Sequence, residues 1–212
     1  MSSQPIHDAA TVVLVRRAPT PQVLMGQRGA RAVFMPNKFV FPGGRVDPAD
    51  AQTPLAPGPS AGLRAQLMRD SAADPGALCA AGIREVWEET GLRIAAPGPT
   101  GSYLGAGLGP NAAALRLFFR AITPPGRPRR FDARFFLCEA SAVAGDAEDF
   151  SGADDELQFL RWVPLDEARG LDLPFITGIA LAEVAAILAD PAAARPVPFF
   201  DNTGPHSRLR QL

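Results

Sequence analysis

The sequence has few of the residues on which several common active sites depend. It has only two histidines, His7 and His206, and both lie near the ends of the chain, so histidine-based chemistry is not expected. The two cysteines, Cys79 and Cys138, lack the spacing of a zinc site or of a disulfide framework. Small buried thiols are common in protein cores, and we interpret both cysteines as reduced core residues.

Long apolar runs and an excess of charge are also missing. No apolar stretch reaches the ~18 residues that a membrane span needs, and the N-terminal segment lacks the charged and apolar regions of a signal peptide. A formal net charge of −1 provides no global field that would attract nucleic acid or an anionic membrane. These absences predict a cytoplasmic protein that binds neither nucleic acid nor membranes.

The chain has 212 residues, a length that suits a single domain spanning 1–212. Its 20 glycines and 22 prolines exceed average usage, and because apolar segments lie between them they indicate long loops rather than disorder.

The most informative stretch is Arg84-Glu85-Val86-Trp87-Glu88-Glu89-Thr90-Gly91. On a helix its three glutamates stand in i, i+3 and i+4 relation and share one face. An apolar stripe at helical spacing, typical of a helix packed on a sheet, lies opposite and comprises Cys79, Ile83, Val86, Trp87 and Thr90. Asp74-Pro75 supplies an N-cap and a first-turn proline, and Gly91 suits a left-handed C-cap, so we predict a helix over 75–90.

A charged helix face is usually solvated surface, but three features argue for a site here. The small Ala81, one turn before Glu85, is expected to leave room for an approaching group. Like charges this close repel one another unless a cation neutralises them, and carboxylates are hard ligands that suit Mg²⁺ or Mn²⁺. In addition, a short strand and a glycine-rich loop, residues 39–50 (FVFPGGRVDPAD), precede the helix.

These residues resemble the Nudix hydrolases, whose box reads G-x5-E-x7-R-E-U-x-E-E-x-G-U, with U an aliphatic residue. The segment REVWEETGL matches every defined position of the second half. If Gly44 is the box glycine, Asp50 replaces the first glutamate, and Arg84 stands 26 residues beyond its expected place. The insertion, the FPGGRVDPAD stretch and the RRFDARFF segment at 129–136 are similar to the coenzyme A diphosphatase branch of the family.

The resemblance implies an α/β/α sandwich with a mixed β-sheet and hydrolysis of a diphosphate linkage. It also implies that Gly44, Glu85, Glu88 and Glu89 hold Mg²⁺ or Mn²⁺, and that one of the glutamates or a later loop carboxylate acts as base. Within the acidic loop 145–156, Glu156 is our first choice for that carboxylate and Asp155 the second. We expect Arg84, one turn before Glu88, to orient its carboxylate.

The remaining pattern predicts strands at 9–16, 22–28, 39–41, 115–122, 131–140 and 157–163, with a brief one near Tyr103-Leu104. It predicts helices at about 61–71, 164–168 and 177–189. The insertion at about 51–73 would be either a lid or a packed surface decoration. An irregular tail from about 195 could pack on the core, cross to another subunit in a homodimer, or border the substrate.

Four arginines are candidates for binding substrate phosphates, although solvated surface is an equally good reading for most of them: Arg28, Arg45, Arg129 and Arg130. The predicted substrate is a nucleotide-type diphosphate, with coenzyme A or an acyl derivative leading, and ADP-ribose, NADH or a dinucleoside polyphosphate as alternatives. A Nudix-fold nucleotide-binding regulator without hydrolysis is the rival from another class.

Overall fold

The computed structural model describes residues 4–17, 19–98, 107–204 and 206–212. Within these ranges it has helices η1 (Pro48–Gln52), α1 (Ala61–Leu67), α2 (Pro75–Thr90), η2 (Ala112–Ala114), η3 (Ala140–Ala142), α3 (Leu165–Ala168) and α4 (Phe175–Ala189). Its strands are β1 (Ile6–Arg16), β2 (Gln22–Arg28), β3 (Phe39–Val40), β4 (Gly43–Arg45), β5 (Ala95–Pro97), β6 (Leu108–Pro110), β7 (Arg116–Ile122), β8 (Arg130–Glu139), β9 (Leu157–Pro164), β10 (Pro198–Asp201) and β11 (Arg208–Gln211). None of the helices in these ranges is both long and apolar enough to cross a membrane.

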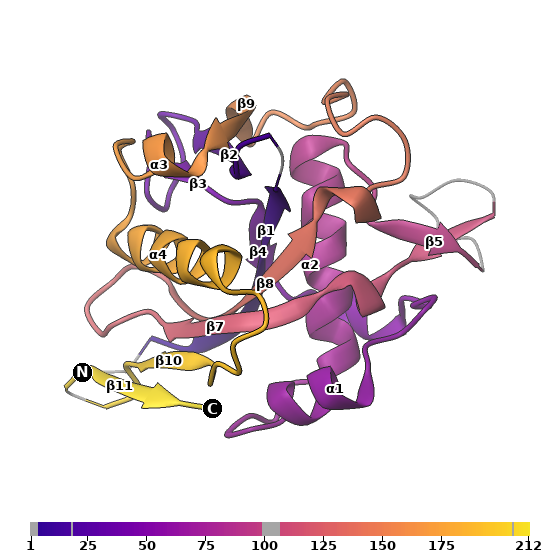
Figure 1. The fold of residues 1–212 in the computed structure, drawn as a ribbon. Helices are drawn as coiled ribbons and strands as arrows, with labels where there is room; N and C mark the ends of the chain where they lie inside the picture. The colour runs from indigo at the N-terminus through magenta and orange to yellow at the C-terminus, as the bar shows by residue number, and fades with distance from the viewer. Residues whose placement is uncertain (1–3, 18, 99–106, 205) are drawn as a thin grey trace.

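The long strand β1 organises the main sheet, whose order is β11-β10-β7-β8-β1-β2-β3 (Figure 1). It runs parallel to β8 along one edge, and its other edge pairs antiparallel with β4 and then with β2. Strand β9 adds to β2, and β10 runs parallel to β7. Parallel and antiparallel pairs therefore occur in one sheet, which confirms the predicted mixed topology.

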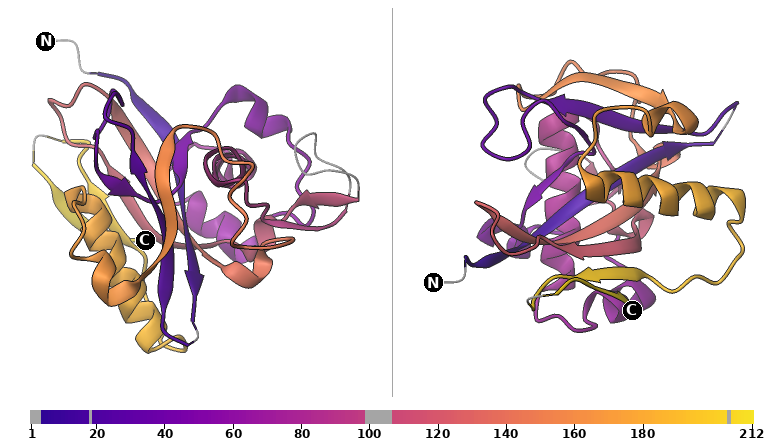
Figure 2. Two further views of the ribbon diagram at one scale, coloured as in Figure 1. Left: turned by 90° about the horizontal axis from the view of Figure 1, so that it is seen from above. Right: turned by 90° about the vertical axis from the view of Figure 1, so that its left-hand side faces the viewer.

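Helices cover both faces of this sheet (Figure 2). Alternate side chains of β1 point to opposite faces, so Val12 and Leu14 join one apolar core with α1 and α2 residues, while Val13 and Val15 join a second core with α4 residues. The two cores on the two faces confirm the α/β/α sandwich. Both cysteines are buried and free.

Helix α2 begins and ends as its caps predict. The Asp74 side chain accepts a hydrogen bond from Gly76 N at 2.8 Å, and Gly91 adopts a left-handed conformation with φ of 75°. The apolar residues Ile83 and Val86 are fully buried against the sheet. Ala81 is also fully buried, so the expectation that it leaves open room beside the glutamates is wrong: its methyl group fills the core.

Two other expectations about local structure are corrected. Gly43 and Gly44 form strand β4, paired with Thr11 and Ala10 of β1, rather than a loop. The tail is not irregular, because β10 and β11 form an antiparallel pair that extends the main sheet beside β7. A tail sequence rich in proline hides these strands, which form because an existing strand edge is there to pair with. The strand expected near Tyr103-Leu104 lies outside the described residues.

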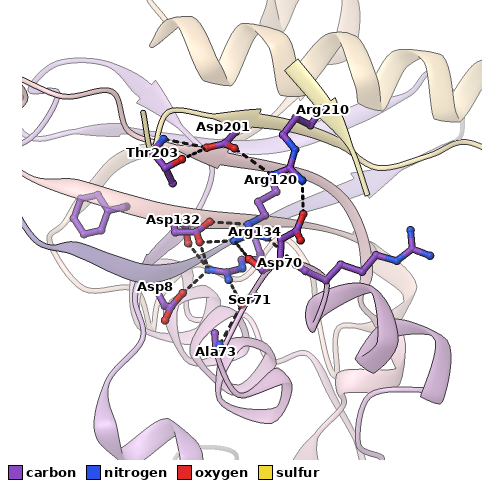
Figure 3. Close-up of polar contacts among 12 residues, drawn as sticks. Asp8, Asp70, Ser71, Ala73, Arg120, Asp132, Arg134, Asp201, Thr203 and Arg210 are labelled. Atoms are coloured by element: carbon purple, nitrogen blue, oxygen red, sulfur yellow. Dashed lines mark hydrogen bonds and ion pairs between the residues drawn. The ribbon is translucent and has the colours of Figure 1, made fainter. Parts of the chain in front are cut away.

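The insertion is packed on the domain. Leu63 and Leu67 of α1 are buried in the first core, and the residues that follow α1 meet a cluster of buried charges (Figure 3). Arg120 of β7 donates to the carbonyl oxygens of Arg69 and Asp70 at 3.0 and 3.1 Å. These contacts favour the packed decoration over the lid.

Strand β8 supplies the centre of this cluster. Its Arg134 is 1% exposed and donates to Ser71 Oγ at 2.6 Å, and it forms ion pairs with Asp8 and Asp132. Asp132 also accepts from Arg120 at 2.7 and 2.9 Å. The segment RRFDARFF therefore ties the end of the insertion to the sheet.

We predict that Arg134→Met destabilises the protein by about 3 kcal/mol, because it removes the ion-pair partner of Asp8 and one of the two partners of Asp132. The measurement is the free energy of unfolding in urea. Arg116→Met, at an exposed arginine of neighbouring strand β7, is the control and should change stability little. Equal losses of unfolding free energy in the two variants would show that the buried cluster contributes no more to stability than an exposed arginine does.

Candidate active site

The three glutamates lie in the last two turns of α2. At this end the helix dipole is negative, so each carboxylate meets an unfavourable field in addition to its two neighbours. The backbone of the acidic loop also reaches this end of the helix, where Asp154 N donates to the Glu88 carbonyl oxygen at 2.8 Å. Such a concentration of negative charge has no packing advantage.

Glu89 is the most deeply placed of the three. It is 1% exposed, and its Oε2 accepts a hydrogen bond from Gly43 N at 2.8 Å. Its Oε1 is buried and has no hydrogen-bond partner. Burial raises the pKa of this carboxyl well above its ordinary value; the Gly43 hydrogen bond opposes the rise, and the charges of Glu85 and Glu156 add to it.

Glu85 lies against strand β4. A Cβ atom at Gly44 would stand 2.4 Å from Glu85 Oε1, so only glycine allows this carboxylate to lie here. Burial raises the Glu85 pKa to about 7, even though the neighbouring Arg84 lowers it. The charges of Glu88 and Glu156 raise it further.

Arg84 holds two of the glutamates. Its Nη1 donates to Glu85 Oε1 and to Glu88 Oε2, both at 2.8 Å. The predicted contact with Glu88 is therefore present, and Glu85 is a second partner. Arg84 in turn is fixed by Asp50, which accepts from Nε at 2.9 Å and from Nη2 at 3.1 Å, and by the Arg45 carbonyl oxygen at 3.1 Å.

Asp50, at the position where the box has glutamate, is 3% exposed and belongs to η1. Besides holding Arg84, it accepts a hydrogen bond from Asp47 N at 2.8 Å. The bidentate ion pair between Asp50 and Arg84 thus joins the two halves of the motif, which the insertion separates in sequence. Asp50 therefore orients Arg84.

Glu156 and Arg28 close the other side of the glutamate group. Arg28 ends β2 opposite Leu157 of β9, and its guanidinium donates to Glu156. Glu156 is close enough for its charge to raise the pKa of both Glu85 and Glu89. Glu156 and Asp155 are both exposed. Arg28 Nε is buried without a hydrogen-bond partner.

The donor set suits a divalent cation. Two of its carboxylates, Glu85 and Glu89, are desolvated, and the unpartnered Glu89 Oε1 is a buried oxygen for which a cation would compensate. Across the described parts of the chain, however, no three histidine, cysteine, aspartate or glutamate side chains already stand in an arrangement that could hold a metal. The reason is local: Arg84 binds Glu85 and Glu88, and Glu89 faces Gly43 N.

A cavity of about 380 Å³ adjoins this group. Gly43, Gly44 and Arg28 form its wall on the glutamate side, and apolar side chains from several elements form most of the rest: Phe34, Phe41, Phe131, Phe135, Phe175 and Phe200. Sequence reasoning missed this cavity, because its walls come from segments far apart in the chain. The only hint was that the phenylalanine-containing tail could border a substrate, and Phe200 does line the cavity.

The candidate phosphate-binding arginines separate into distinct groups. Arg28 and Arg129 line the cavity, and Arg127 joins them. Arg45 is exposed and does not line it. Arg130 is turned inward, where it donates to the carbonyl oxygens of Thr123 and Asn202 at 3.0 and 2.7 Å, so its guanidinium holds the chain together and is no longer a candidate for a substrate phosphate.

We predict that Glu89→Gln stabilises the protein in the absence of divalent cations. A carboxyl whose pKa is raised on folding makes the folded state lose stability as pH rises above the ordinary value of 4.5, because the unfolded chain releases its proton first. The amide escapes this loss, so the variant should gain about 1 kcal/mol or more at pH 8 and little near pH 4.

The measurement is the melting temperature across this pH range, with exposed Glu167→Gln as the control. A Glu89→Gln variant that melts at or below the wild-type temperature at every pH would refute the assignment of electrostatic strain to this position.

Comparison with known proteins finds sequence relatives that match part of the chain. No family model matches the sequence. The acyl-coenzyme A diphosphatase NUDT19 of Gallus gallus is 29% identical, over 62% of this chain and 54% of its own length. The putative nudix hydrolase 7 of Caenorhabditis elegans is 50% identical over 46 residues, which are 22% of this chain and 15% of that protein. The chain thus spans about half the length of the first relative and less of the second.

Solved structures cover the chain more fully. A Nudix hydrolase from Alicyclobacillus acidocaldarius matches with a TM-score of 0.66 and 26% identity, over 89% of this chain and 97% of that one. An Ap4A hydrolase complex from Caenorhabditis elegans has the same fold, with a TM-score of 0.52 and 17% identity over 87% and 98% of the two chains. The chain therefore shares the fold of solved Nudix hydrolases and carries on α2 the complete REVWEETGL motif, which resembles the second half of their box.

Proposed function

We propose that the protein hydrolyses the diphosphate linkage of a nucleoside diphosphate joined to another moiety. The observation that carries this proposal is the group of Glu85, Glu88 and Glu89, two of them desolvated, beside a cavity of about 380 Å³. Cleavage of a phosphoric anhydride needs a positioned water and neutralisation of charge more than covalent help from the protein. A cluster of hard oxygen donors supports that kind of chemistry.

Glu85, Glu88 and Glu89, together with the Gly44 carbonyl oxygen, are the groups that would hold Mg²⁺ or Mn²⁺. When bound, such a cation supplies charge neutralisation to the diphosphate and its leaving group. Asp50 and Arg84 set the positions of Glu85 and Glu88. Because Arg84 binds both carboxylates, we expect it to give up part of these contacts to a bound cation.

Glu156 is the candidate base on the loop side, and a glutamate of α2 is the alternative. Its ion pair with Arg28, a residue that lines the cavity, holds it beside the glutamate group. Arg28 also acts on the glutamate group itself, because its charge lowers the pKa of Glu89. A substrate phosphate at Arg28 would therefore compete with Glu156 for the same guanidinium.

Coenzyme A or an acyl derivative is the leading substrate. The supporting facts are the similarity to a protein named acyl-coenzyme A diphosphatase and the apolar walls of the cavity. ADP-ribose, NADH and dinucleoside polyphosphates are the alternatives. A cytoplasmic location and assembly as a homodimer stay predictions.

We predict that the purified protein, supplied with Mg²⁺ or Mn²⁺, hydrolyses at least one member of a panel containing coenzyme A, acetyl-coenzyme A, ADP-ribose, NADH and diadenosine polyphosphates. Products identified by mass should show cleavage between the two phosphates. Glu88→Gln should lower kcat by about 100-fold or more, as expected when a group that acts electrostatically on the transition state is lost.

Glu167→Gln, an exposed glutamate of α3, serves as the control and should keep full activity. The proposal fails if no panel member is hydrolysed with either metal, or if Glu88→Gln is as active as the wild type. Nucleotide binding without turnover would instead support a regulatory protein with this fold.

A further inference from the structure

Two pairs of aromatic rings line the large cavity. Phe34, from the segment between β2 and β3, meets Phe131 of β8 edge to face, with ring centroids 5.7 Å apart. Phe175 of α4 meets Phe200 of β10 in the same manner at 6.3 Å. Phe175 is 76% exposed, so its ring is accessible to a ligand in the cavity. These rings favour a planar aromatic group as the occupant.

The polar groups of the cavity wall are largely engaged with the protein itself. Asn202 Nδ2 donates to the Ile122 carbonyl oxygen at 2.6 Å, and Asn202 Oδ1 accepts from Ser207. The amide therefore has little capacity left to read the edge of a base. Recognition of an aromatic group here would depend on stacking, which contributes about 1–3 kcal/mol per base and tolerates different bases.

Two arginines line the cavity just before the start of β8. Arg127 and Arg129 line it from the connector between β7 and β8, and both are exposed. Neither makes a hydrogen bond or ion pair with any residue that the structure describes. Three prolines, Pro124, Pro125 and Pro128, restrict the backbone of this connector.

The cavity therefore carries positive charge in two places. Arg28 borders the glutamate side, where the diphosphate of the substrate would lie. Arg127 and Arg129 directly precede Arg130, which pairs with Ile6 of β1, whereas Gly44 pairs with Ala10, roughly 13 Å along the same strand at about 3.3 Å per residue. A single diphosphate does not reach across that distance. The phenylalanines of the cavity and its basic rim together fit a nucleoside whose sugar carries a phosphate of its own.

We propose that this cavity binds the nucleoside half of the substrate, with the base between the two phenylalanine pairs and an additional ribose phosphate on Arg127 and Arg129. This inference rests on the proposed function for the position of the diphosphate. It assigns substrate preference to the rim arginines and predicts that the enzyme favours dinucleotides or nucleotide conjugates with a phosphorylated ribose. Volume is no obstacle, since small-molecule sites span about 300–1,000 Å³ and this cavity measures about 380 Å³.

The first test compares substrates that differ only in the ribose phosphate: coenzyme A against 3′-dephospho-coenzyme A, and NADPH against NADH. The wild type should show a KM at least about tenfold lower for the phosphorylated member of one pair, the equivalent of about 1.4 kcal/mol. The pair that shows the preference tells whether the 3′ or the 2′ phosphate is read.

The double variant Arg127→Gln/Arg129→Gln should lose this preference by raising KM for the phosphorylated member, with kcat and the dephosphorylated member unchanged. Arg116→Gln, at an exposed arginine away from the cavity, is the matched control. Phe175→Ala should raise KM for both members of a pair equally, whereas Phe159→Ala, at an equally exposed phenylalanine outside the cavity, should raise neither.

A binding measurement separates failure of this inference from failure of the proposed hydrolysis. Calorimetric titration should show that adenosine 3′,5′-bisphosphate or adenosine 2′,5′-bisphosphate binds more tightly than adenosine 5′-monophosphate, whether or not the protein cleaves anything. Equal affinities for all three, or a rim variant that keeps the wild-type preference, would overturn the inference. A Phe175→Ala defect that appears only with long acyl chains would overturn it too, by placing the acyl arm in this cavity.

Discussion

The burial of like charges at the end of α2 is the constraint on which the surrounding structure depends. Glu85 and Glu89 are desolvated beside one another at the negative end of a helix, and each neighbouring feature limits the resulting strain. Gly44 lacks the side chain that would collide with Glu85, and Gly43 N donates to Glu89. Arg84 binds the two outer carboxylates. One buried oxygen, Glu89 Oε1, has no hydrogen-bond partner, and a bound cation would compensate for its burial.

The long insertion separates the two halves of the motif in sequence without separating them in space. Before the insertion, Asp50 forms an ion pair with Arg84 of α2. After it, Arg120 and Arg134 donate hydrogen bonds to the residues that lead into α2 (Figure 3). Where the box has glutamate, the shorter Asp50 reaches Arg84 from η1. The insertion then serves as packed structure, and the walls of the large cavity come from elsewhere.

Local features of the chain were predictable from the sequence. Helix α2 follows from its caps and apolar stripe, and the strands β1, β2, β7, β8 and β9 follow from runs of β-branched and aromatic residues. What depends on tertiary contact was not: β4, β10 and β11 are strands because a neighbouring edge accepts them. The sequence also could not tell that adjacent arginines diverge, with Arg129 at the cavity and Arg130 inside the protein, since this depends on where the connector meets the start of β8.

Binding of Mn²⁺, followed by electron paramagnetic resonance, tests directly whether the glutamates of α2 hold a divalent cation. We predict that the wild-type protein binds the ion through these glutamates, and that Glu89→Gln weakens this binding at least about tenfold, since hard carboxylate oxygens are the ligands that Mn²⁺ prefers. Equal binding of Mn²⁺ by the two proteins, or none by the wild type, would show that these glutamates are not a cation site.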